Sequence, residues 1–401
     1  MDKKFLIWDN AKDAMIHLVL FLMLIGCVNV FSASFVAAEA DNGNGYFYLL
    51  RYLFFAAVGL FGMWVIGYKF DYHYFFKHMK AIYALMFLSL AAVFVLGRAV
   101  KGAQRWIIIG SFSFQPSEFV KLGIILLGAA YLGQLMVKGK TPHLYKLGVN
   151  TAFVCSLVLA GMVYKQPDMG TAAIILALML MLYVVAGMPV SEVVCVLGGG
   201  LVAAALLIMV APYRFNRVKI WFDPWSDPQG IGYQTVQSMV SIGSGGLLGN
   251  TFGMGSGKFF YLPEAHTDFA FAIFCQEWGF LGALFLIAVF VLLGLSMYVI
   301  ARDVQDRSGF LLVTGVNFLV VGQAVANMAM VCGILPVIGV PLSFISYGGT
   351  SLIASLASIG FVISVYRSEQ RRKVQKQQPS APVPHFHAGG SYLHRERRWQ
   401  R

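Results

Sequence analysis

Uncharged apolar runs, each about as long as a membrane is thick, recur along this sequence from Met15 to Val365. A helix of roughly 20 apolar residues crosses a hydrocarbon core of about 30 Å. Of the 401 residues, 12% are charged and 58% are hydrophobic, whereas soluble domains carry roughly 25% charged residues. We therefore predict an all-α polytopic membrane protein.

About ten transmembrane helices are predicted, with boundaries good to a few residues. The predicted spans are 14–36, 48–68, 81–97, 117–136, 148–164, 170–187, 189–211, 269–301, 309–332 and 346–366. They divide the chain into an N-terminus (1–13), a ten-helix membrane domain (14–366) and a tail (367–401). A large loop (212–268) separates helices 7 and 8, and an even number of spans places both termini on one side.

The basic residues predict the orientation of these spans. Twenty of the thirty lie on the side of the N-terminus, namely Lys3, Lys4, Lys12, Lys69, Lys77, Lys80, Lys138, Lys140, Lys146, Arg302, Arg307 and nine residues from Arg367 to Arg401. Because basic residues near helix ends stay cytoplasmic, we predict an N-in, C-in topology with an extracellular 212–268 loop. The first apolar run is longer than a signal-peptide core, which favours a retained anchor.

The tail and the large loop differ in composition. The tail (367–401) is basic and rich in Gln, Pro, Ser and His, so we expect it to be disordered and cytoplasmic. Much of the net charge of +12 lies there, and attraction to the membrane lipids of the inner leaflet explains it without nucleic acid. The loop is rich in Trp, Tyr, Phe, Gly and Pro, which predicts a functional, re-entrant or interfacial segment.

Charged residues of both signs fall on the outer side or at membrane depth. The basic ones are Arg51, Arg98, Lys101, Arg105, Lys121, Lys165, Arg214, Arg217, Lys219 and Lys258, and the acidic ones are Glu118, Asp168, Asp223, Asp227, Glu264, Asp268 and Glu277. Such residues are functional candidates because burying them is costly. A mixed-sign cavity suits an anionic, lipid-linked substrate. The alternative is that these charges pair with one another and hold the loops on the bundle.

Cysteine and glycine patterns exclude two other kinds of site. The five cysteines are isolated in apolar stretches, without metal-ligand spacing, so they are predicted to be buried small hydrophobes. The glycine-rich run that ends at Lys258 has Phe252 and Phe259 where a P-loop needs Gly and Ser or Thr. No metal site is predicted, although a divalent cation bridging Asp268 or Glu264 and a phosphate is an open alternative.

Several motifs occur in order between residues 105 and 349. The most specific is the seven-residue segment Pro263 to Phe269, PEAHTDF. The others are Arg105-Trp106, Phe114 to Glu118 with Lys121, Gln166 to Thr171, Asp223 to Trp225, Gly232 to Gln234, Gln237-Ser238, Ile242 to Gly246, Gly333 to Pro341 and Phe344 to Gly349. With these motifs the chain resembles the SEDS family (shape, elongation, division and sporulation), which includes FtsW and RodA.

The resemblance implies a ten-helix glycosyltransferase of the bacterial cytoplasmic (inner) membrane. Such enzymes polymerise lipid II into peptidoglycan strands at the outer face and release undecaprenyl pyrophosphate. Ala265 in the central motif favours the division member, FtsW, and hence the septum, with the elongation-type RodA polymerase as an alternative. The implied partners are a class B penicillin-binding protein, which is a transpeptidase, and other divisome proteins.

The resemblance also assigns roles to residues. It places the essential carboxylate at Asp268, which we predict to be the general base; the alternative is that Thr267 or Asp268 only caps the following helix. The predicted substrate-binding residues are Arg105, Glu118, Lys121, Arg214, Arg217, Lys219, Lys258, His266 and Glu264. The basic members suit a pyrophosphate, whereas Glu118 and Lys121 alone would indicate a local ion pair and His266 a structural residue.

Two other functions use many of the same features. A lipid II flippase also needs a polar cavity and broken helices, but alternating access would require substrate contacts on both leaflets. Here the charged residues in the motifs cluster on the outer side. A scaffold that only binds division proteins would not need Asp268, Arg105 and Glu118 in one chamber.

Overall fold

The structure is a computed structural model that describes residues 5–100, 103–110, 112–146, 150–210, 212–250, 253 and 262–377. Its main helices are α1 (Ala11–Asn42), α2 (Phe47–Trp64), α3 (Tyr72–Lys77), α4 (Met79–Leu96), α5 (Pro116–Val137), α6 (Thr151–Lys165), α7 (Met169–Val185), α8 (Val190–Val210), α9 (Pro212–Phe222), α10 (Tyr233–Ser244), α11 (Ala270–Asp303), α12 (Arg307–Asn317), α13 (Gln323–Val331) and α14 (Gly349–Gln377). The π-helical turns η1 (Val65–Lys69) and η4 (Phe318–Gly322) extend α2 and join α12 to α13, and η2 (Pro224–Ser226) is a 3-10 turn.

The predicted class, an all-α polytopic membrane protein, is confirmed. Within the described ranges, seven helices are long and apolar enough to cross a membrane, and three shorter apolar helices begin at Thr151, Met169 and Val190. These helices fall on the ten predicted spans, with α12, η4 and α13 sharing one of them. Helices are the expected elements because every backbone polar group in lipid must be satisfied within its own segment.

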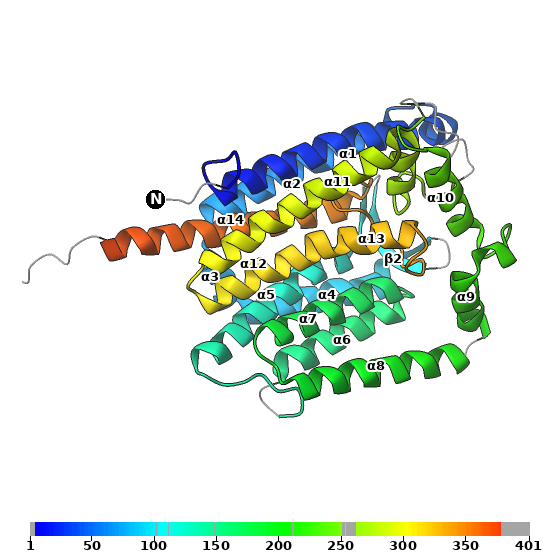
Figure 1. The fold of residues 1–401 in the computed structure, drawn as a ribbon. Helices are drawn as coiled ribbons and strands as arrows, with labels where there is room; N and C mark the ends of the chain where they lie inside the picture. The colour runs from blue at the N-terminus through cyan, green and yellow to red at the C-terminus, as the bar shows by residue number, and fades with distance from the viewer. Residues whose placement is uncertain are drawn as a thin grey trace, which may run out of the picture.

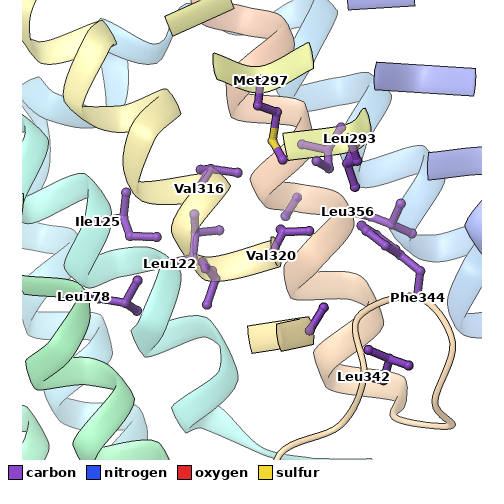
Figure 2. Packing of buried hydrophobic residues seen from close by; sticks show 14 of the residues in the cluster. Leu122, Ile125, Leu178, Leu293, Met297, Val316, Val320, Leu342, Phe344 and Leu356 are labelled. Carbon is purple, nitrogen blue, oxygen red and sulfur yellow. The ribbon is translucent and has the colours of Figure 1, made fainter. Parts of the chain in front are cut away.

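The long helices lie side by side as a bundle (Figure 1). The start of α1 and the end of α14 lie at one end of this bundle, whereas β2, α9 and α10 lie at the other. We call the second end the motif end, because the motif segments 105–118 and 262–269 lie there. Figure 2 shows the core between the helices, where Leu122 and Ile125 of α5 lie near Val316 of α12, all of them at most 5% exposed.

A small antiparallel sheet, which the sequence did not lead us to expect, connects α4 to α5. Its strands are β1 (Arg98–Val100), β2 (Ala103–Ile109) and β3 (Phe112–Phe114), in the order β1-β2-β3. Ile107 pairs with Phe114 and Ile109 with Phe112, with Gly110 at a φ of 60° beside the turn. The apolar Ile107–Ile109 run therefore forms a strand rather than extending a helix, and it positions Arg105 next to the bundle.

The large loop contains helices, and the tail begins with a helical segment where disorder was expected. Within 212–268, the structure has α9, η2 and α10, and α10 packs against α11 and α13. The tail was expected to be disordered from residue 367, but α14 continues to Gln377. Two contacts explain the extension: Arg367 donates to the Gly67 carbonyl at 2.6 Å, and the buried Glu369 accepts from the Gln305 amide at 3.2 Å. The rest of the tail lies outside the described residues.

Candidate functional site

The PEAHTDF motif forms a tight turn just before α11. The Glu264 carbonyl accepts hydrogen bonds from the amides of Thr267 (3.1 Å) and Phe269 (3.2 Å), and Glu264 has a φ of 56°. Thr267 Oγ1 donates to Glu264 Oε2 at 2.7 Å. The N-cap residue of α11 is Phe269, without a side-chain capping bond. The alternative that Thr267 or Asp268 caps this helix is therefore wrong, and the carboxylate of Asp268 is not used for capping.

Asp268 lies where several charged residues converge. Burial is the largest cause that raises its pKa, to about 7, and the nearby carboxylates of Glu264, Asp168 and Glu118 raise it further, against the lowering effect of Arg105. The carboxylate also lies beside Gly339, since a Cβ added there would be 3.7 Å from Asp268 Oδ2. A carboxyl with this pKa exchanges protons near neutral pH, as a general base must.

Arg105, on β2, affects the ionisation of Asp268. Its guanidinium donates to the carbonyls of Gln166 (3.3 Å) and Pro167, and Nη1 is 3.7 Å from Asp168 Oδ1. Asp168 is the N-cap of α7 and accepts from the Thr171 amide at 3.1 Å. The Arg105 side chain stays 29% exposed, so it has an open side on which an anion can bind.

The start of α7 connects this arginine to Asp268. A Cβ added at Gly170 would be 2.1 Å from the backbone oxygen of Ile338, so α7 touches the segment before α14 without room for a side chain. Gly339, the neighbour of Ile338, is the residue that lies beside Asp268. Arg105, the α7 start and Asp268 therefore belong to one continuous site.

Glu118 and Lys121 form the ion pair that their spacing on α5 predicts. Lys121 Nζ is 2.9 Å from Glu118 Oε1 and donates to Gln323 Oε1 at 2.8 Å. Both charged side chains are buried, at 7% and 2% exposure. Contact of either residue with a substrate stays a prediction, because the pair is closed against α13.

His266 packs in an aromatic cluster. Its ring centroid is 4.5 Å from that of Tyr48 and 5.8 Å from that of Tyr347, and its carbonyl accepts from the Tyr347 amide at 2.8 Å. These contacts attach the PEAHTDF turn to α2 and to the segment before α14. A substrate contact of His266 stays a prediction.

Of the remaining predicted phosphate contacts, Lys219 is the one whose side chain the structure describes. Lys219 is exposed on α9, which packs mainly against α8 and η2. Arg214 and Arg217 are on the same helix, although only their backbone is described, and Lys258 lies outside the described residues. Within the part of the chain that is described, no three His, Cys, Asp or Glu side chains gather in a way that suits a metal ion.

Two uncharged residues of the site were missed by the sequence analysis. Asn327 and Gln323 lie four apart, hence on one face of α13. Asn327 Nδ2 donates to the carbonyls of Asp268 (2.7 Å) and Val340 (2.6 Å), and Gln323 Nε2 donates to the Pro341 carbonyl at 3.0 Å. Two amides at helical spacing in an apolar span were the available signal.

A family model described as cell cycle protein, for FtsW, RodA and SpoVE, matches residues 12–371. The "Probable peptidoglycan glycosyltransferase FtsW" of Trichlorobacter lovleyi is 36% identical over 87% of this chain and 92% of its own length. The "Stage V sporulation protein E" of Bacillus subtilis is 34% identical over 88% and 96%.

Solved structures agree with these relatives. A chain from a study titled "Structural coordination of polymerization and crosslinking by a peptidoglycan synthase complex" aligns with a TM-score of 0.74 and 29% identity, over 88% of this chain and 97% of that chain. The rod shape determining protein RodA of Thermus thermophilus aligns with a TM-score of 0.65 and 28% identity, over 88% and 96%. The chain therefore belongs to the FtsW/RodA/SpoVE family of cell cycle proteins.

Proposed function

We propose that this protein is a peptidoglycan glycosyltransferase that polymerises lipid II into glycan strands at the outer face of the cytoplasmic membrane. Family membership over residues 12–371 and relatives named as peptidoglycan glycosyltransferases support this function. The structural observation that carries it is the environment of Asp268, where burial and the carboxylates of Glu264, Asp168 and Glu118 raise the pKa to about 7 and Arg105 lowers it.

The proposed reaction needs one base and one site for an anion. The acceptor sugar hydroxyl attacks the anomeric carbon of a second sugar, and the bond from that carbon to the pyrophosphate oxygen breaks. The lipid pyrophosphate leaves with the electron pair, and the hydroxyl proton passes to the Asp268 carboxylate. Arg105, through the exposed side of its guanidinium, is proposed to bind the pyrophosphate.

The other predicted contacts have different parts in this proposal. Lys219, Arg214, Arg217 and Lys258 belong to the 212–268 segment, so we propose that they attract the anionic lipid-linked substrate before it reaches Asp268. Glu264 and His266 shape the turn that carries Asp268. Glu118 and Lys121 form the buried polar floor of the site and would contact substrate only when their pair opens.

We further propose a role in division rather than elongation, with a class B penicillin-binding protein and divisome proteins as partners at the septum. Three of the relatives, at 36 to 37% identity, carry the name FtsW. A similar chain comes from a study whose title names the coordination of polymerization and crosslinking by a peptidoglycan synthase complex. With an N-in, C-in topology, Asp268 would lie on the outer side of the membrane, where polymerisation and crosslinking of the strand take place. The two ends of the described chain lie at one end of the bundle, which is consistent with this topology (Figure 1).

An experiment with lipid II supplied on one side of a membrane distinguishes a polymerase from a flippase. The protein, with its penicillin-binding partner, is reconstituted in liposomes with labelled lipid II, and the products are resolved by gel. Glycan strands are the expected result. Movement of intact lipid II between leaflets without strands, under conditions in which a related polymerase is active, contradicts the proposal and supports transport.

A further inference from the structure

Asn327 connects the turn that carries Asp268 to the segment before α14. Its side chain is fully buried in α13, at 0% exposure. Both hydrogens of Nδ2 are donated, one to the Asp268 carbonyl (2.7 Å) and one to the Val340 carbonyl (2.6 Å). Because both neighbours only accept, the amide group has one orientation that satisfies them. Asn327 Oδ1 has no hydrogen-bond partner among the described residues, so the side chain serves here as a donor.

The Val340 segment is itself fixed from several directions. Gln323 Nε2 donates to the Pro341 carbonyl (3.0 Å), Tyr52 of α2 donates to the Phe344 carbonyl (2.6 Å), and Ser343 donates to the Val320 carbonyl (3.1 Å). Phe344 is held at a φ of 65°, in the left-handed region that a bulky residue rarely adopts. This segment is therefore a rigid support.

The Asp268 peptide is attached to that support by Asn327. The next carbonyl, that of Phe269, accepts from the Ala272 amide at 2.9 Å, in a bond that spans three residues at the start of α11. The Asp268 carbonyl points instead to α13. Gln323, one turn before Asn327, accepts from Lys121, so the same face of α13 also holds the Glu118–Lys121 pair.

We propose that Asn327 is the positioning residue of Asp268: its two donated hydrogen bonds fix the Asp268 main chain on the Val340 segment and thereby set where the carboxylate meets the acceptor hydroxyl. The proposal rests on the proposed polymerase function. Asn327 touches no reacting atom, so its removal acts on the chemical step through the position of Asp268.

Asn317→Leu is the control variant for Asn327→Leu. The Asn327→Leu change removes both donors while roughly keeping the side-chain volume, and it takes the donor away from the buried Val340 carbonyl and from the half-buried Asp268 carbonyl. Asn317 also donates from a membrane helix to one backbone carbonyl, that of Gly294 at 3.1 Å. Gly294 lies 24 residues after Ala270 on α11, beyond the kink at Gly279. Asn317→Leu therefore reports the cost of such a loss away from Asp268.

The test compares wild type, Asn327→Leu and Asn317→Leu as full-length proteins with the penicillin-binding partner, over a range of lipid II concentrations and pH. A displacement of about 1 Å at a reacting group costs roughly 100-fold. We expect kcat of Asn327→Leu to fall by about 10- to 100-fold with KM within about twofold of wild type, whereas Asn317→Leu keeps both near wild type.

The pH profile of kcat distinguishes a positioning role of Asn327 from a purely structural one. Burial is the largest cause of the raised pKa of Asp268, and Glu264, Asp168, Glu118 and Arg105 also affect it. When Asn327 positions Asp268, its loss loosens the turn and brings the carboxyl towards water. The acidic limb of the kcat profile of Asn327→Leu should then move to lower pH. Equal effects of the two variants, or a lower kcat with an unmoved limb, overturn the positioning role while the polymerase function stands. An inert wild type refutes the polymerase function and the positioning role with it.

Discussion

The pH dependence of strand synthesis follows from the environment of Asp268. Burial and three neighbouring carboxylates raise its pKa to about 7, from an ordinary value of 3.8. A general base works as the carboxylate, which makes up about 1% of the group at pH 5, about 50% at pH 7 and about 90% at pH 8. We therefore expect the initial rate to rise nearly tenfold per pH unit below about pH 6 and to level off above about pH 8.

The measurement is the initial rate of labelled lipid II polymerisation from pH 5 to 8.5 at constant ionic strength, with the folded fraction checked at each pH. An aspartate at its ordinary pKa would give a flat profile over this range. A flat profile, or a rate that falls as the pH rises towards 8, refutes the assignment of Asp268 as the base. Because the folded pKa is the higher one, the proton on Asp268 stabilises the fold, and this contribution declines as the pH rises from about 4 to above 7.

Three further predictions concern the residues around Asp268. Lys121→Met leaves Glu118 buried without its cation and should destabilise the protein by about 3 kcal/mol, whereas the double variant Glu118→Gln/Lys121→Met should lose less, because no charge is left unpaired. Equal losses in detergent unfolding would contradict the cost assigned to the unpaired Glu118 carboxylate. Gly170→Ala places a Cβ against the Ile338 oxygen and should cost about 1–3 kcal/mol, whereas Gly161→Ala meets nothing within 4 Å and should be neutral; equal melting temperatures would contradict the packing. Tyr52→Phe removes the donor to Phe344 and should cost about 1 kcal/mol, measured as the same shift in unfolding; an unchanged midpoint would show that the bond is not needed.

The membrane class could be predicted because apolar length is a property of the sequence itself. Each predicted span has a helix in the structure, because lipid offers no hydrogen-bond partner and a helix satisfies its backbone groups internally. The sheet at residues 98–114 was missed because Ile107–Ile109 is a short apolar run, for which periodicity does not distinguish strand from helix. The helical start of the tail was missed because its composition does not reveal the contacts of Arg367 and Glu369.

Arg105, Glu118 and Asp268 could be named from the sequence as candidates, whereas the uncharged residues of the candidate site could not. Motifs at 105, 118 and 268 are distant in sequence, and the structure brings them close enough for Arg105 and Glu118 to affect the ionisation of Asp268. Asn327 carries no charge and belongs to no motif, so its two bonds become visible only when α13 is placed against the Asp268 turn. The sequence also left open whether Asp268 caps α11, because a cap depends on the φ and ψ angles of the turn.

The most direct test of the account exchanges one carboxylate for an amide at each end of α11. Asp268→Asn removes the proposed base, whereas Asp303→Asn changes an exposed aspartate at the far end of the same helix. Each variant is purified folded with its penicillin-binding partner and supplied with labelled lipid II, and the strands are resolved by gel. We predict strands from wild type and Asp303→Asn and none from Asp268→Asn. Strands of normal length and rate from Asp268→Asn would contradict it.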